Sequence, residues 1–242
     1  MNEWVIDAGH TRVKWARLDA DGRIAAASGC PIADIDRLDD DLACSPGGRI
    51  LASLQTREPL AERIGEMARR HDCRLHALAT ASVALEVAPA YPGLGSDRWL
   101  ALQHPWATTG GAVCVIDCGT AMTIDVVDDS GRHLGGWIMA GLETARESLL
   151  GRAERLPCER ARAVRPDVPA TDTATGVEAG IRLQMAGAVE RGVAAATGRL
   201  GKNPVVWLTG GDAAAIMPLV RIDAQMDEHL VLRGLAMAAR KC

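Results

Sequence analysis

Two short segments of this sequence carry residues that could bind phosphate and a cation. Each has an aspartate at the end of an apolar run and a glycine two positions later, at Asp7 and Gly9 and again at Asp117 and Gly119. Glycine lets the backbone approach a ligand closely, and such a turn can direct amide N–H groups toward an anion. The carboxylate suits Mg²⁺, which keeps several waters when it binds protein. The expected chemistry is phosphoryl transfer from a nucleoside triphosphate, by positioning and charge neutralisation.

The two segments belong to an internal repeat. Residues 5–10 (Val-Ile-Asp-Ala-Gly-His) align with residues 115–120 (Val-Ile-Asp-Cys-Gly-Thr), 110 positions later. Both copies continue as a strand, an Asp/Ser-Gly turn and a further strand. A single Asp-x-Gly turn is a weak signal, whereas two in register indicate a duplicated, ligand-binding lobe. The alternative is an old duplication whose turns are purely structural.

The elements that must position these turns follow from the hydrophobic pattern. Strands are expected over residues 3–7, 12–19, 23–28, 49–54, 75–79, 112–118, 121–127, 133–140 and 205–208, and helices over 56–71, 97–106, 173–198, 212–217 and 228–239. The fold class is therefore α/β, with two duplicated lobes, each a mixed sheet with helices, and an active cleft between them. We expect an N-terminal lobe over 1–107 and a C-terminal lobe over 108–242.

Composition excludes several classes of protein. The hydrophobic content of 48% and charged content of 24% are those of a globular chain. The net charge is −4 without a long basic run, so nucleic acid is not an expected partner. No apolar run is long enough to span a membrane, and the first residues do not resemble a signal peptide. Seven cysteines without a CxxC pair predict a reducing, cytoplasmic location, with Cys114 and Cys118 as core residues.

Five segments in the same order as in a known family carry a resemblance to the type III pantothenate kinases, within the superfamily of acetate kinases, sugar kinases, Hsp70 and actin. They are residues 7–15 (DAGHTRVKW), 95–99 (GSDRW), 117–125 (DCGTAMTID), 135–142 (GGWIMAGL) and 209–213 (TGGDA). The fourth has Ala140 where proline is usual, and the fifth resembles the glycine turn on the adenosine side. The resemblance implies two ribonuclease-H-like, actin-like lobes.

The family phosphorylates the primary hydroxyl of pantothenate with ATP, the first step of coenzyme A biosynthesis. By resemblance, Asp97 is the general base, and the substrate-binding residues are Gly95, Ser96, Asp97, Arg98, Thr173 and Tyr91. The nucleotide-binding residues are Asp7, Ala8, Gly9, His10, Thr11, Arg12, Val13, Lys14, Gly119 and Thr120. Asp7 would hold Mg²⁺ through water, and Asp117 a monovalent cation, K⁺ or NH₄⁺. The resemblance also implies a homodimer whose site is completed across the interface, with dimerisation helices in the C-terminal lobe.

Several of these residues have a structural alternative. Asp97 and Thr173 could each be a helix cap. Tyr91 lies closer to Asp97 than the family tyrosine does, so it could belong to a shortened loop or be unrelated to that tyrosine. Lys14 could contact phosphate or simply face solvent.

One difference from the family motifs is the reason to consider other functions. His10 occupies the position of a family asparagine, and histidine is bulkier and can be neutral or cationic. The alternatives to a pantothenate kinase are therefore a catalytically impaired homologue acting as an accessory or regulatory binding protein, or a kinase of another small hydroxyl substrate.

Overall fold

The computed structural model describes residues 2–55, 58–153, 156, 159–161 and 164–241. The chain forms two compact units. The first consists of Met1–Gly110, Gly131–His133 and His229–Cys242, and the second of Gly111–Ser130 and Leu134–Glu228. The end of the chain therefore belongs to the first unit, whereas the sequence placed it in a C-terminal lobe over 108–242.

A five-stranded mixed sheet forms the centre of the first unit. Its strands are β1 (Glu3–Ala8), β2 (Arg12–Leu18), β3 (Ile24–Pro31), β4 (Gly48–Leu54) and β5 (Cys73–Ala77), in the order β3-β2-β1-β4-β5. The β1–β2–β3 segment is an antiparallel meander, while β4 pairs parallel to β1 and β5 parallel to β4. Because β1 and β4 run in parallel, their carboxyl ends lie at the same edge of the sheet.

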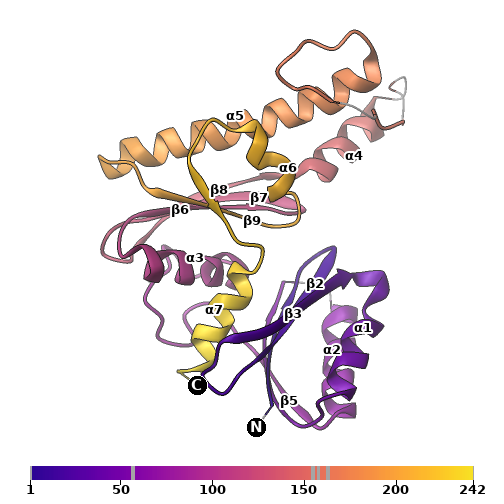
Figure 1. Ribbon diagram of the computed structural model, residues 1–242, viewed down its shortest axis with the longest axis vertical. Helices are drawn as coiled ribbons and strands as arrows, with labels where there is room; N and C mark the ends of the chain where they lie inside the picture. Colours follow the sequence, from indigo (N-terminus) through magenta and orange to yellow (C-terminus); the bar gives the residue numbers. More distant parts are fainter. Residues whose placement is uncertain (1, 56–57, 154–155, 157–158, 162–163, 242) are drawn as a thin grey trace. The chain divides into compact units, whose positions relative to one another are not determined.

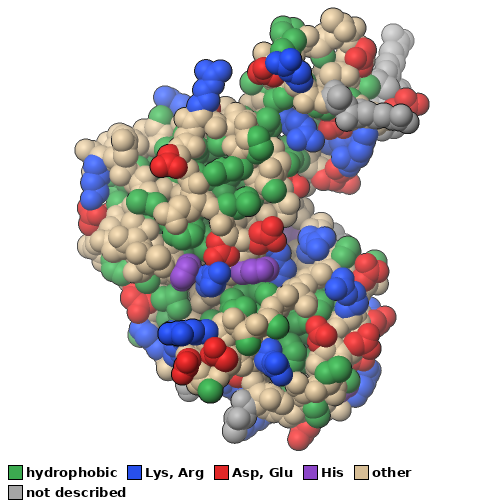
Figure 2. Space-filling model, viewed as in Figure 1, with side chains coloured by type: hydrophobic (Ala, Val, Ile, Leu, Met, Phe, Trp, Pro, Cys, Tyr) green, Lys and Arg blue, Asp and Glu red, His purple; other side chains and the backbone are tan. Residues whose placement is uncertain are grey.

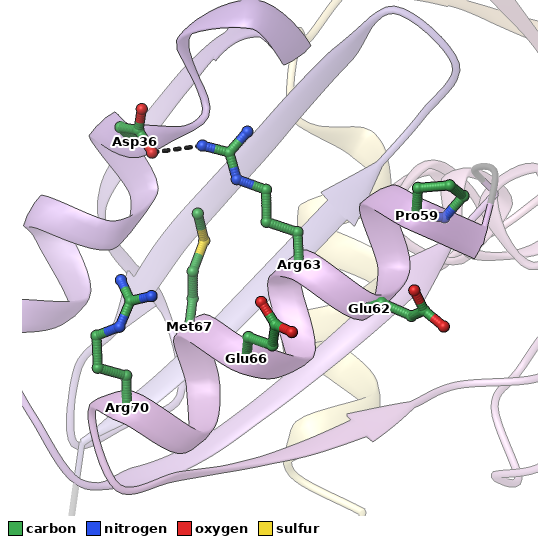
Figure 3. A pocket seen from close by; sticks show the side chains of 7 residues that line it. All are labelled: Asp36, Pro59, Glu62, Arg63, Glu66, Met67 and Arg70. Carbon is green, nitrogen blue, oxygen red and sulfur yellow. Dashed lines mark hydrogen bonds and ion pairs between the residues drawn. The ribbon is translucent and has the colours of Figure 1, made fainter.

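Helices cover both faces of this sheet. α1 (Asp36–Ala43) and α2 (Glu58–Arg70) share one hydrophobic core with β1, β2 and β4. α2 buries Leu60, Ile64, Met67 and Ala68, a helical spacing. The start of the helix expected over 56–71 lies outside the described residues. α1 and α2 are also joined by an ion pair of 2.5 Å between Asp36 and Arg63, two of the residues that line a pocket along α2 (Figure 3).

The other face of the first sheet carries α3 (Ser96–Thr109) and α7 (Leu230–Ala239). These two helices pack closely, because a side-chain carbon at Gly234 would lie 2.2 Å from the carbonyl oxygen of Leu100. The fit requires glycine at that position, and it joins the last helix of the chain to the helix that begins with the Ser-Asp-Arg sequence.

The second unit repeats this sheet. Its strands are β6 (Val113–Cys118), β7 (Ala121–Val127), β8 (His133–Ala140), β9 (Val205–Thr209) and β10 (Ala224–Met226), in the order β10-β9-β6-β7-β8. β6 and β7 are antiparallel, whereas β9 is parallel to β6 and β10 to β9. Matching β6 to β1 gives the same strand order and the same directions in every pair described, which confirms two duplicated mixed sheets.

The described residues of the second unit include the helices α4 (Leu142–Arg152), α5 (Thr173–Leu200) and α6 (Ala213–Ile216). α5 and α6 lie over one face of the sheet, where their apolar side chains form a core with β6, β7 and β9 (Figure 1). Short 3₁₀ helices occur at Ile32–Asp34 and Met217–Leu219.

Acidic and basic side chains are interspersed on the face shown in Figure 2, so neither sign of charge dominates it. In the part of the chain that the structure describes, none of the helices combines the length and the apolar character that crossing a membrane requires.

The cysteines of the second sheet are core residues, as expected. Burial raises the pKa of the Cys114 and Cys118 thiols to about 12, while Cys44 in the first unit is exposed. Since the thiolate is the reactive form, N-ethylmaleimide at pH 8 should label Cys44 and leave Cys114 and Cys118 unmodified until the protein is unfolded in urea. Peptide mass spectrometry checks this, and labelling of Cys114 or Cys118 in the native protein would contradict it.

Candidate functional site

The first Asp-x-Gly turn connects β1 to β2. Ala8 pairs with Val13, and the Gly9 N–H donates to the carbonyl oxygen of Arg12 over 3.0 Å. The side chains of Ala8 and Val13 are fully buried, so these residues can offer a ligand only their backbone. The Gly9 N–H is used to close the turn, which leaves the exposed residues after it as the groups that could face an anion.

The second turn is built in the same way but is one residue shorter. Cys118 pairs with Met122, and the Gly119 N–H donates to the carbonyl oxygen of Ala121 over 3.2 Å. In the first sheet Lys14 pairs with Asp7, and in the second sheet Thr123 pairs with Asp117. Thr123 is therefore the counterpart of Lys14 in the repeat. The repeat is thus offset by 110 positions before the turns and by 109 after them.

Asp97 lies in the first turn of α3, after an N-cap formed by Gly95. Its side-chain oxygen accepts the N–H of Arg98 over 2.8 Å, so it satisfies one donor of the first turn without being the cap residue itself. Burial raises the pKa of the Asp97 carboxyl, while the Arg98 N–H and the charges of Arg98 and His10 act in the opposite direction. Asp97 and His10, which follows β1, therefore lie within electrostatic range of each other.

A buried polar cluster lies beneath Asp97, at the carboxyl end of β4. The hydroxyls of Ser53 and Ser96 are 2.9 Å apart, and the Gln55 side-chain N–H donates to the Ser96 oxygen over 3.0 Å. Ser53 is the register partner of Asp7 in the adjacent strand. Because the Ser96 side chain is buried and bonded to two protein partners, it fixes the start of α3 rather than facing a ligand.

Arg98 and Tyr91 form a second pair of expected site residues. An Arg98 N–H donates to the Tyr91 hydroxyl over 3.0 Å, which places Tyr91 beside the Ser-Asp-Arg sequence despite its short spacing from it. The segment before Tyr91 is fixed to α3 at Val87. The Val87 carbonyl accepts the indole N–H of Trp99 over 2.8 Å. The backbone N–H of Val87 donates to the side-chain oxygen of the fully buried Gln103 over 3.0 Å.

Gly95 sets the space available to Asp97. A side-chain carbon at Gly95 would lie 2.5 Å from an Asp97 carboxylate oxygen. The Gly95→Ala variant should therefore fold with a rotated Asp97 carboxylate and lose about tenfold or more in kcat. Steady-state kinetics checks this against Gly93→Ala, because Gly93 has no atom within 4 Å of an added carbon. Equal activity of the two variants would contradict the assignment.

Asp117 in the second unit lies between two glycines. A side-chain carbon would be 3.6 Å from an Asp117 carboxylate oxygen at Gly119 and 2.5 Å from it at Gly210. The Asp212 N–H donates to the Cys118 carbonyl over 2.9 Å, which joins the turn after β9 to the end of β6. Burial and the nearby Glu143 raise the pKa of the Asp212 carboxyl, against the charge of Arg182.

Residues at the start of α4 form hydrogen bonds with the second turn. The Thr120 carbonyl accepts the Gly141 N–H over 3.0 Å and the Thr144 hydroxyl over 2.7 Å, while the Thr120 side chain is exposed. Thr173 is the first residue of α5 and is also exposed. The N-cap of that helix is Asp172, whose carboxylate accepts the Thr175 N–H over 2.9 Å, so the alternative in which Thr173 is the cap is wrong.

Sequence reasoning did not identify Ser53, Gln55 or Gln103 as parts of the site. A signal was present for the first two, because they are polar residues that follow the apolar run at residues 50–52. Asp212 was noted only as part of a glycine turn. The described residues contain no group of three or more His, Cys, Asp or Glu side chains that could hold a metal ion.

Solved structures place this fold in a class. A Campylobacter jejuni protein described as a conserved Baf family transcriptional activator has a TM-score of 0.66 and 19% identity, covering 98% of this chain and 97% of that one. A ROK family glucokinase from Streptomyces griseus, solved with glucose and AMPPNP, has a TM-score of 0.50 and 12% identity, covering 99% and 100%. The fold, with its two duplicated mixed sheets, is that of the sugar kinases and actin-like ATPases.

Sequence comparison identifies the family within this class. The profile described as type III pantothenate kinase matches residues 4–195. A type III pantothenate kinase of Nitrosospira multiformis is 31% identical over 242 residues, covering 98% of this chain and 90% of the relative. This chain belongs to the type III pantothenate kinase family, and it is an enzyme of the kinase class.

Proposed function

We propose that this protein transfers the terminal phosphoryl group of ATP to the primary hydroxyl of pantothenate, giving 4′-phosphopantothenate for coenzyme A synthesis. The observation that carries the proposal is the arrangement at the start of α3. There Asp97 has a raised pKa, and the adjacent Arg98 is hydrogen-bonded to Tyr91. This arrangement occurs in a chain that belongs to a family named for the reaction.

Each of these residues has a role that its chemistry suits. The Asp97 carboxylate orients the primary hydroxyl of pantothenate and accepts its proton late in a loose phosphoryl transfer. Arg98 pairs with the pantothenate carboxylate, for which a planar guanidinium with several N–H donors is well suited. Tyr91 holds Arg98 in place through its hydroxyl and lies where it can contact the same substrate. Gly95 offers its backbone to the substrate beside Asp97, and Thr173 contacts pantothenate.

The two turns bind the nucleotide phosphates. In the first, backbone groups of residues 8–13, the His10 side chain and the Lys14 ammonium act on phosphate; in the second, Gly119 and Thr120 do so. Asp7 would hold Mg²⁺ through water and Asp117 a monovalent cation, and each ion would neutralise phosphate charge at its own turn. A single carboxylate with water and phosphate is the usual coordination of Mg²⁺, so the donors present fit this cation.

His10 is compatible with catalysis. Its side chain is exposed and the Gly9 turn closes normally, so the larger ring does not crowd the loop. This geometry supports an active enzyme over an impaired regulatory homologue.

ADP production by the purified protein tests the proposal. With ATP, Mg²⁺ and K⁺ present, turnover should require pantothenate, and omission of any component should reduce it. Turnover with other small alcohols but none with pantothenate would favour a kinase of another substrate. Absence of both turnover and nucleotide binding in calorimetry would favour the accessory protein.

We also propose a homodimer. Large apolar side chains of the second unit are exposed, with Ile138 62% and Trp137 45% exposed on β8 and Leu183 59% exposed on α5. Burial of such residues against a second copy would remove them from water. Light scattering at micromolar concentration should give twice the chain mass, and a monomeric mass would contradict the dimer.

A further inference from the structure

Gln55 lies beside the proposed general base without a role in the reaction described so far. It follows β4 directly, at the carboxyl end of that strand, and it is half-buried. Its side-chain N–H donates to the buried Ser96 hydroxyl, which is itself 2.9 Å from the Ser53 hydroxyl. The amide plane of Gln55 is therefore fixed at one end by a buried hydrogen-bonded cluster.

The other end of the Gln55 amide is its carbonyl oxygen. Within the described part of the chain, the hydrogen bonds of the Gln55 side chain involve its N–H alone. The carbonyl oxygen lies 3.8 Å, and an Asp97 carboxylate oxygen 2.5 Å, from the position that a side-chain carbon at Gly95 would take. Two acceptor oxygens thus lie close to the Gly95 backbone, and the Asp97 carboxylate occupies the space that the missing side chain of Gly95 leaves.

This pair of oxygens matches the chemistry of one end of the proposed substrate. Pantothenate carries its primary and secondary hydroxyls on carbons separated by a single quaternary carbon, so the two O–H donors lie close together. Its amide N–H lies further along the molecule, toward the carboxylate. Of these two donors, the secondary hydroxyl is therefore the one that lies next to the primary hydroxyl, which receives the phosphoryl group.

We infer that the Gln55 side-chain carbonyl accepts a hydrogen bond from the secondary hydroxyl of the acceptor while Asp97 receives the primary hydroxyl. Gln55 is then a substrate-binding residue that determines specificity for a 1,3-diol. The inference rests on the proposed function, because it takes pantothenate as the acceptor. The Ser96 and Ser53 hydroxyls are positioning groups that hold the Gln55 amide in the required orientation.

The test uses two acceptors, pantothenate and its analogue that lacks only the secondary hydroxyl. With the wild-type protein, KM should be about fivefold to tenfold higher for the analogue, the effect of one neutral hydrogen bond. The Gln55→Met variant should raise KM for pantothenate by the same factor, leave KM for the analogue unchanged and keep kcat within about twofold. Gln55→Asn, which withdraws the carbonyl by one carbon, should give the same selective loss.

The control is Gln225→Met, which changes an exposed glutamine on β10 and should leave both KM values unchanged. Turnover of the analogue by each variant shows that the protein is folded. An equal rise in KM for both acceptors, or no rise for pantothenate, would overturn the inference and leave the proposed function intact. Failure of the wild-type protein to phosphorylate pantothenate would instead overturn the proposed function and this inference with it.

Discussion

Replacing Asp97 by asparagine is expected to lower kcat with pantothenate by about 100-fold to 10,000-fold, the range for loss of a positioned general base. The asparagine amide can still accept the Arg98 N–H, so the first turn of α3 keeps its hydrogen bond. The substrate should therefore still bind, and the loss should appear in kcat rather than in KM. Steady-state kinetics with ADP detection measures both.

Asp40→Asn is a matched control, because it makes the same chemical change on the exposed side of α1. The pH dependence provides a second readout. The base must be ionised, and burial raises the Asp97 pKa, so activity should fall with decreasing pH at a value above the ordinary 3.8 of an aspartate. Turnover of Asp97→Asn within a few-fold of the wild type would rule out Asp97 as the base.

Replacing Gly210 by alanine is expected to lower the free energy of unfolding by about 2–4 kcal/mol and to abolish ADP production at low ATP. Gly210 has a φ of +93°, where a side chain is strained. An added carbon would also lie 2.4 Å from the Cys118 carbonyl oxygen and 2.5 Å from Asp117. The variant must therefore push the turn after β9 away from the end of β6, which displaces Asp117.

The neighbouring glycine supplies the control for this substitution. Gly211 has no atom within 4 Å of an added carbon, and Gly211→Ala should leave both stability and activity close to wild type. Urea unfolding followed by circular dichroism measures the stability, and titration of ATP in the activity assay measures the effect on the site. Equal behaviour of the two alanine variants would show that the turn tolerates a side chain at Gly210.

The strands near the two turns could be predicted because local pattern and tertiary environment agree there. The alternation over residues 12–19 and the apolar run over 112–118 correspond to β2 and β6. In contrast, α1 was not expected, since it is a short acidic helix that buries only Leu38 and Leu42. β10 has three residues and lies at the edge of its sheet, so it has no periodicity of its own.

The candidate site was predictable where it consists of motif residues and not where it depends on packing. Asp97, Arg98 and Tyr91 could be named as candidates from the resemblance, but the hydrogen bond between Arg98 and Tyr91 and the one between Gln55 and Ser96 could not. The contact between Gln55 and Ser96 joins residues 41 positions apart, and it exists only because α3 begins at the end of β4. Local sequence rules do not include such contacts between distant segments.

The membership of α7 in the first unit determines which of the two units can fold first during synthesis. The helix at Leu230–Ala239 packs on the first sheet and on α3, so α7 cannot cover β1 and β4 until residues 230–239 have been made. The second unit, encoded later than most of the first, has all of its residues by Glu228. The second unit can therefore fold before the first, although the first contains the earlier residues, and deletion of α7 would damage the unit formed mainly by residues 1–110.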